Sequence, residues 1–175
     1  MTRSALPAEL SPSAVVPIID RREQCPLVLP SLGEPVWGTL ATGDYSAVGL
    51  EHVVSIERKS LPDLLACVGQ ERSRFDREVQ RLLAYPVRAL ICETTWVGIE
   101  TGGWQSRVTP AAALGSCLGW VAMGLPVLMV GTHEAAGRYV SRLLYIAARR
   151  RWREARALVA GIVEHAGPEA VEVNA

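Results

Sequence analysis

Three charged residues in one short stretch of this chain could bind a metal ion and activate water. Asp44 stands near the end of one strand-like segment, and Glu57 and Lys59 end the next, which reads Val-Val-Ser-Ile-Glu-Arg-Lys. β-Branched and apolar residues favour a strand over residues 53–59. Side chains alternate along a strand, so Glu57 and Lys59 face one side and Arg58 faces the other. Two carboxylates and a lysine at a sheet edge suit a hard divalent cation and its activated water.

This arrangement is suited to hydrolysing a phosphodiester. Asp44 and Glu57 would hold Mg²⁺ or Mn²⁺, and Lys59 would orient the water or neutralise developing charge. A simpler explanation is a surface hairpin with solvated charges, which each residue taken singly would favour. The charges follow directly on an apolar run that is expected inside a sheet. Charges are costly there unless they are paired or bound to metal, so the metal site is the stronger hypothesis.

A second acidic pair, Asp20 and Glu23, follows the apolar run at residues 15–19. Alone they would form a turn in which Asp20 is an ordinary capping residue. If this first strand lies beside the hairpin, the pair joins the same acidic cluster, where several carboxylates need a cation to be stable together. They would then hold a second ion or position the first. Arg22 and Arg58 would offset them or contact a phosphate.

The order of apolar segments predicts an α/β layer fold with a mixed sheet. Ser60 is expected to cap a helix that has Pro62 in its first turn and Asp63 as a short version of the capping-box acid. Residues 94–109 are expected to form a loop or ragged hairpin. Strands are predicted at residues 15–19, 36–45, 53–59, 87–93 and 126–130, with the second and third paired as a hairpin, and helices at 60–68, 71–83, 109–123 and 133–162.

Composition limits the class of protein. The chain has 175 residues, which fits one domain, and a formal net charge of zero, which argues against a generic nucleic-acid coat but not against a local basic patch. Four scattered cysteines are expected to be buried free thiols, which favours a reducing, cytoplasmic location over secretion. No signal peptide is evident, and glycines and a proline interrupt residues 111–131, so no membrane span is expected.

Two arginine-rich segments each allow two interpretations. Arg72, Arg74 and Arg77 lie on a helical stretch that is either a solvated face with intrahelical pairs or a grip for a nucleic-acid backbone. The C-terminal helix is either a packed amphipathic helix with a wet face or a surface for DNA or another subunit. The three histidines are far apart and do not suggest zinc, and His133 is expected to be a cap-region residue.

The motif as a whole resembles a known family. Gly43-Asp44, then Glu57-Arg58-Lys59, then Asp63 after three more residues, is similar to the signature of the XPF/MUS81/Hef (ERCC4-type) nuclease domain. The upstream run from Asp20 to Glu23 matches an Asp-x-Arg-Glu element of that family. Three later features also follow the family's order, namely Arg74-Phe75, the strand that ends at Glu93, and Ser106-Arg107-Val108. The resemblance covers residues 15–150.

The resemblance implies a restriction-endonuclease-like fold and a Mg²⁺- or Mn²⁺-dependent cut of branched or flapped DNA, as in DNA repair or recombination. It also implies a homodimer or heterodimer formed through the nuclease domain, which we place at residues 15–165 between tails at 1–14 and 166–175. A compact, stand-alone nuclease of bacterial or phage type is expected, because no tandem helix-hairpin-helix module is recognisable. The alternatives are a non-catalytic DNA-binding or scaffold subunit and a nuclease that acts on RNA.

Carried over by motif position, the resemblance assigns three sets of residues. The catalytic set is Asp20, Glu23, Asp44, Glu57, Arg58, Lys59 and Asp63. The metal ligands are Asp44, Glu57 and Asp20, and Lys59 is the catalytic lysine. Arg22, Arg72 and Arg74 are the candidates for DNA contact.

Overall fold

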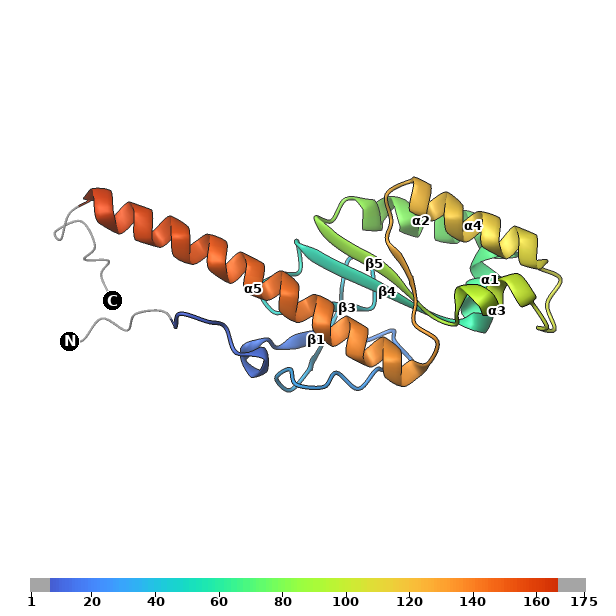
Figure 1. Ribbon diagram of the computed structural model, residues 1–175, viewed down its shortest axis with the longest axis horizontal. Coiled ribbons are helices and arrows are strands. Elements are labelled where there is room, and N and C mark those ends of the chain that lie inside the picture. Colours follow the sequence, from blue (N-terminus) through green and yellow to red (C-terminus); the bar gives the residue numbers. More distant parts are fainter. Residues whose placement is uncertain (1–6, 167–175) are drawn as a thin grey trace.

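The computed structural model describes residues 7–166, which form a mixed six-stranded sheet with helices on both faces (Figure 1). The strand order is β2-β1-β3-β4-β5-β6. β3 pairs antiparallel with both β1 and β4, whereas the outer pairs are parallel. The predicted α/β fold is therefore confirmed. The strands are β1 (Pro17–Asp20), β2 (Val36–Gly38), β3 (Tyr45–Ala47), β4 (Val54–Ser60), β5 (Val87–Glu93) and β6 (Val127–Met129).

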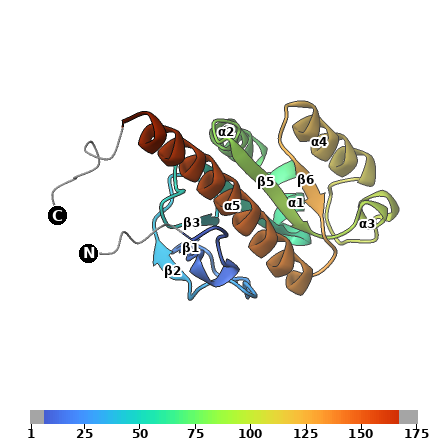
Figure 2. The ribbon, with the colours of Figure 1, turned by 60° about the vertical axis from the view of Figure 1, so that its left-hand side comes forward.

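Each face of the sheet has its own apolar core. α5 (His133–Ala166) crosses one face, where Ile56 and Val140 are fully buried (Figure 2). The other helices cover the opposite face, where Phe75 and Trp120 pack edge to face with ring centres 4.9 Å apart. Because β4 is covered on both faces, any charge on it has to be compensated. The other helices are α1 (Leu61–Val68), α2 (Arg72–Leu83), α3 (Trp96–Thr101) and α4 (Pro110–Ala122).

The junction between β4 and α1 forms as the sequence predicts. Ser60 is both the last residue of β4 and the N-cap of α1. Its Oγ accepts a hydrogen bond from the Asp63 amide at 3.3 Å and donates one to the Asp63 carboxylate at 2.5 Å. The chain therefore turns from strand to helix directly after Lys59. A break at residues 69–71 then separates α1 from α2, as expected from Gly69.

The prediction of one strand over residues 36–45 is wrong. The structure has two strands there, β2 at the sheet edge beside β1 and β3 between β1 and β4. Two features turn the chain between them. The Leu40 amide donates to the Asp20 carboxylate at 2.7 Å, and Gly43 adopts a φ of 78° just before Asp44. Only the second of these strands forms the predicted antiparallel partner of β4.

The loop predicted over residues 94–109 contains a short helix, α3. Thr95 caps it by accepting a hydrogen bond from the Gly98 amide at 2.9 Å, and Gly102 ends it at a φ of 74°. Ile99 is fully buried and fixes the helix on the core. The glycines of this segment lower helix propensity, which explains why the sequence pattern favoured a loop.

The described part of the N-terminal segment, residues 7–14, lies against α5. Trp152 donates its indole N–H to the Pro7 carbonyl at 3.2 Å, and Glu9 pairs with Arg149 at 3.0 Å. Part of the arginine-rich face of α5 therefore binds this chain itself. Residues 1–6 and 167–175, which the sequence analysis assigned to tails, lie outside the described residues.

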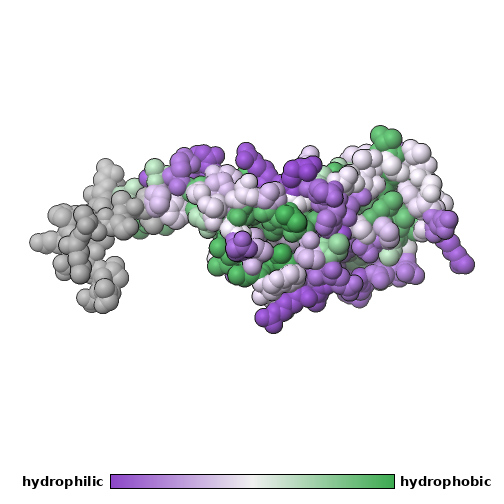
Figure 3. Space-filling model, turned by 90° about the horizontal axis from the view of Figure 1, so that it is seen from below, coloured by the Kyte–Doolittle hydropathy of each residue, from purple (hydrophilic) through white to green (hydrophobic). Residues whose placement is uncertain are grey.

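The surface is mixed in character. In the view from below, apolar surface lies in the middle of the molecule and is bordered by hydrophilic side chains (Figure 3). No helix among residues 7–166 combines the length and apolarity that a membrane span needs. Cys67, Cys92 and Cys117 are buried free thiols, but Cys25 is exposed, so the expectation that all four are buried is wrong for Cys25.

Gly43 is required by its surroundings, and this yields a test of the turn that positions Asp44. A Cβ at residue 43 would clash with the Ser55 side chain and approach the Ile56 carbonyl at 3.1 Å. We expect Gly43→Ala to lower the free energy of unfolding by roughly 3 kcal/mol, because strain adds to the clash. Gly49→Ala is the matched control, since its φ of 80° is similar but open space surrounds it. Urea denaturation measures the free energy of unfolding of both variants. Equal losses of stability would show that the clash at residue 43 is relieved without cost.

Candidate active site

β4 places charged side chains on both faces of the sheet. Val54 and Ile56 belong to the core under α5, and Arg58 continues that alternation. Glu57 and Lys59 therefore face the side covered by α1 to α4. Lys59 confirms this, because its Nζ lies 5.5 Å from the centre of the Phe75 ring on α2. Arg58 points the opposite way, as strict alternation predicts.

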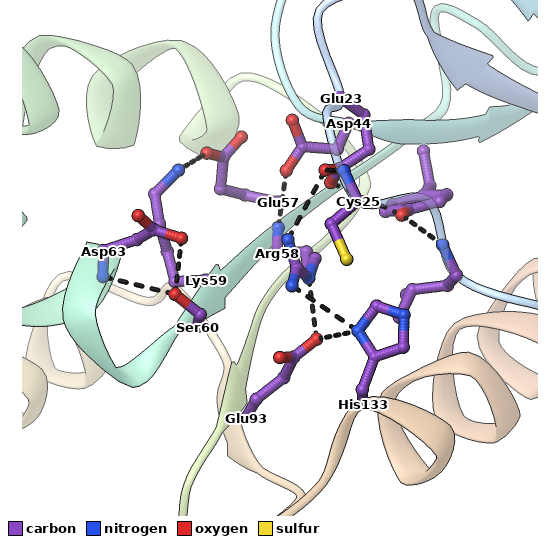
Figure 4. A network of polar contacts seen from close by, with 12 residues as sticks. Glu23, Cys25, Asp44, Glu57, Arg58, Lys59, Ser60, Asp63, Glu93 and His133 are labelled. Carbon is purple, nitrogen blue, oxygen red and sulfur yellow. Dashed lines mark hydrogen bonds and ion pairs between the residues drawn. The ribbon is translucent and has the colours of Figure 1, made fainter.

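The structure brings Asp44, Glu57 and Lys59 together at the end of β4 (Figure 4). Asp44 directly precedes β3, and its Oδ2 accepts a hydrogen bond from the Arg58 amide at 2.8 Å. The Asp44 amide in turn donates to the Ile56 carbonyl at 2.8 Å. Lys59 donates its ammonium to Glu57 Oε1. Two backbone bonds thus hold Asp44 against the strand that carries the other two side chains.

One oxygen of this group has no partner. Glu57 is only 2% exposed, and its Oε2 is buried without a hydrogen bond to any residue that the structure describes. A buried carboxylate oxygen without a donor is destabilising, and a cation is the partner that would suit it best. No three His, Cys, Asp or Glu side chains in the described part of the chain converge into a complete ligand set. Mg²⁺ keeps several waters and is often bound by one or two carboxylates plus a substrate phosphate, so Asp44 and Glu57 fit such an ion.

The ionisation of the three groups is coupled. Burial, reinforced by the charge of Asp44, raises the pKa of Glu57 to about 8. Burial also raises the pKa of Asp44 to about 6, although Lys59 and the Arg58 amide oppose the rise. Burial disfavours the charged form of Lys59, but the Glu57 and Asp44 carboxylates overcome this and raise its pKa. The pKa of Lys59 is raised only while a charged carboxylate lies beside it, so the lysine stays protonated. Asp44 and Glu57 together retain protons to a higher pH than free carboxyl groups do.

On the other face of the sheet, Arg58 is the centre of an ion cluster. Its Nε donates to Glu93 at 2.7 Å, and its Nη1 lies 3.4 Å from Glu23. His133, the first residue of α5, contacts the same Glu93 oxygen at 2.7 Å. Of the two acids that Arg58 was expected to offset, Glu23 lies within ion-pair distance, but Glu93 is closer. Sequence reasoning placed Glu93 at the end of a strand and His133 at the start of a helix, but it assigned neither residue to this cluster.

Asp20 and Asp63, the remaining acids of the motif, direct their carboxylates to other partners. Asp20 accepts hydrogen bonds from Arg22 Nε at 2.6 Å and from the Leu40 amide at 2.7 Å. Burial opposes its ionisation, but these bonds lower the pKa of Asp20 to about 2. To bind metal, Asp20 would have to give up these donors. Asp63 is exposed on the first turn of α1, where it bonds Ser60.

The arginines suggested for DNA contact are already engaged within the chain. Arg22 pairs with Asp20 while most of its side chain stays exposed. Arg72 donates to Ser116 on α4 at 3.0 Å. Arg74 pairs with Glu71 one turn earlier on α2. To bind DNA, each of these arginines would have to replace its contact within the chain with a contact to a phosphate.

Comparisons with known proteins agree with the fold. No protein-family model and no curated protein matches the sequence. The structure is similar to XPF from Aeropyrum pernix, with a TM-score of 0.60 and 17% identity over 82% of this chain and 71% of that one. It is also similar to XPF from Aeropyrum pernix in complex with DNA, with a TM-score of 0.60 and 16% identity over 78% of this chain and 66% of that one. This chain therefore has an XPF-like fold, as its motifs suggested.

The two faces of β4 should respond in opposite ways to loss of a carboxylate. In a chelating buffer at pH 8, Glu57→Gln should raise the free energy of unfolding by on the order of 1 kcal/mol, because it removes a buried charge whose pKa is raised. Glu93→Gln should lower it by roughly 3 kcal/mol, because buried Arg58 loses its closest acid. Chemical denaturation measures both, and destabilisation by Glu57→Gln at pH 8 would contradict this account of the site.

The raised pKa of Glu57 also determines how the free energy of unfolding depends on pH. A carboxyl with a raised pKa in the folded state contributes stability that is complete below its unfolded pKa, here near 4.5, and is lost as the pH rises through about 8. The metal-free wild type should therefore lose stability between pH 5 and 8 more steeply than Glu57→Gln does.

Proposed function

We propose that this protein is a metal-dependent DNA endonuclease that hydrolyses phosphodiester bonds. The observation that carries the proposal is the buried, unpartnered Oε2 of Glu57 beside Asp44 and Lys59. A site that only had to be stable would be better served by an apolar residue at position 57. The XPF-like fold supports the same class of protein, since one of the two similar structures is a complex with DNA.

Each residue of the group has a role in this reaction. Asp44 and Glu57 would hold Mg²⁺ or Mn²⁺, which when bound lowers the pKa of a coordinated water and neutralises phosphate charge. Lys59 remains an ammonium, so it can donate a hydrogen bond to the attacking water or to a phosphate oxygen and stabilise the negative charge that develops there. Arg58, paired with Glu93 on the other face, fixes the strand that presents both neighbours.

The substrate we infer is branched DNA, such as a flap or a fork, with roles in repair or recombination. This preference comes from the resemblance of the Asp44-to-Asp63 motif to XPF/MUS81/Hef nucleases. Arg22 is the most accessible of the three suggested phosphate contacts, since its side chain is 68% exposed. We place the protein in the cytoplasm, where three buried free thiols and one exposed thiol would stay reduced.

The first test is cleavage of a panel of labelled flap, fork, Holliday-junction, single-stranded and RNA substrates. With Mg²⁺ or Mn²⁺ the wild type should cut flap or fork DNA, and Asp44→Asn or Lys59→Met should reduce the rate by at least about 100-fold. Asp76→Asn is the control, because Asp76 is exposed and makes only a 3.8 Å contact with Arg72. Circular dichroism verifies that each variant is folded.

The outcomes separate the alternatives. Activity that survives Asp44→Asn would remove this site from the reaction. DNA binding without cleavage of any substrate, with either ion, would identify a non-catalytic subunit instead. Cleavage of RNA but of no DNA substrate would show that the protein is a ribonuclease that uses the same site.

We further propose that the protein forms a dimer through this domain. α4 has no charged residue, and Leu118, Val121 and Met123 on or beside it are exposed. Apolar surface of this kind is typical of a subunit contact. Light scattering at micromolar concentration should give twice the chain mass, and Leu118→Glu should reduce it to one chain mass. A wild-type monomer under these conditions would contradict the homodimer.

A further inference from the structure

Glu78 on α2 is a carboxylate that the motif does not include. Phe75, Val79 and Leu82 are fully buried and mark the face of α2 that packs on the sheet. Glu78 lies three residues after Phe75, so it sits at the edge of that same face, one turn from the ring that contacts Lys59. Its side chain is half-buried there.

The packing of α2 shows which way this edge faces. On one flank of the helix Arg72 reaches Ser116 of α4, and α4 packs beside β6. Glu78 lies on the opposite flank. Because β4 and β3 lie on the other side of β5 from β6, that flank faces the strands that carry Glu57 and Asp44. Glu78 therefore lies across the candidate active site from those two carboxylates.

Its surroundings leave Glu78 available. The neighbouring acid on this flank, Glu71, is paired with Arg74. Among residues 7–166 no side chain forms an ion pair or hydrogen bond with Glu78 within the usual distances. Its charge is felt at the site, because it adds to burial in raising the pKa of both Asp44 and Glu57. Arg22 and Arg74 also feel this charge, which adds to the rise in the pKa of each, but neither forms an ion pair with Glu78 in the described part of the chain. A cation shared with Asp44 and Glu57 would relieve the remaining repulsion among the three acids.

We propose that Glu78 is a positioning residue for the divalent cation that Asp44 and Glu57 hold, a role that rests on the proposed function. Three carboxylates and the Lys59 ammonium leave two negative charges, which one divalent cation neutralises. The described side chains do not converge into a three-carboxylate ligand set. Glu78 therefore acts by accepting hydrogen bonds from water bound to the ion.

The buried Oε2 of Glu57 is the independent sign that a cation belongs between these groups. The Glu57 side chain is buried, and its unpaired oxygen lies on the face of the sheet that α2 covers. A cation placed between these groups would be attracted by all three carboxylates.

The test is a calorimetric titration of the full chain with Mn²⁺ in the absence of DNA, so that binding is read without activity. Glu78→Gln should weaken Mn²⁺ binding about tenfold, which is typical for the loss of a group that orients metal-bound ligands. Glu78→Asp, which keeps the charge on a shorter side chain, should show a smaller loss. Asp76→Asn is the control on the flank of α2 that carries Arg72, and it should bind as the wild type does, because Asp76 is exposed and lies 3.8 Å from Arg72.

Unchanged Mn²⁺ affinity in a folded Glu78→Gln protein would overturn the role of Glu78 and leave the proposed function intact. A wild type that binds no Mn²⁺ would overturn both together. If Glu78→Gln fails to fold, Glu78→Asp carries the test, and an affinity equal to that of the wild type would then reject the proposal. A purely structural residue would change the unfolding midpoint of the metal-free protein without changing the affinity of the folded one.

Discussion

A carboxylate inside a β-sheet has to be neutralised, and the structure is arranged around that constraint at Glu57. One oxygen meets the Lys59 ammonium, and the other is buried with no donor. The neighbouring Asp44 increases the cost rather than relieving it, since its charge adds to the effect of burial in raising the pKa of Glu57. Such a group is stable only if it takes up protons or a cation. The candidate metal site follows from this imbalance and not from the motif alone.

The opposite face of the same strand explains how the site stays in place. Arg58 is buried and connects β4 to Glu93 on β5 and to Glu23 beyond β1, while His133 links Glu93 to the start of α5. The Arg58 amide also donates to Asp44. Arg58 therefore fixes the group formed by Asp44, Glu57 and Lys59, through its backbone amide on one side and its guanidinium on the other. This arrangement gives rigidity to a region where a small displacement would be costly to catalysis.

Local patterns in the sequence predicted the central features. Alternation over residues 53–59 placed Glu57 and Lys59 on one face, and the Ser60 cap placed the start of α1. Features that depend on contacts between distant segments were not predictable. β2 and β3 separate because Asp20 binds the amide of Leu40, and Arg58 selects Glu93, 35 positions away. Glu78 was not singled out, because its distance from β4 depends on how α2 packs.

The most direct measurement of the central claim is anomalous X-ray diffraction from crystals of the full chain soaked in Mn²⁺. We expect an anomalous peak beside Glu57 Oε2 and within coordinating distance of Asp44, with Lys59 still on the other Glu57 oxygen. A peak elsewhere would contradict it. So would the absence of a peak at this position in crystals soaked at pH 8, where both carboxylates are free to ionise.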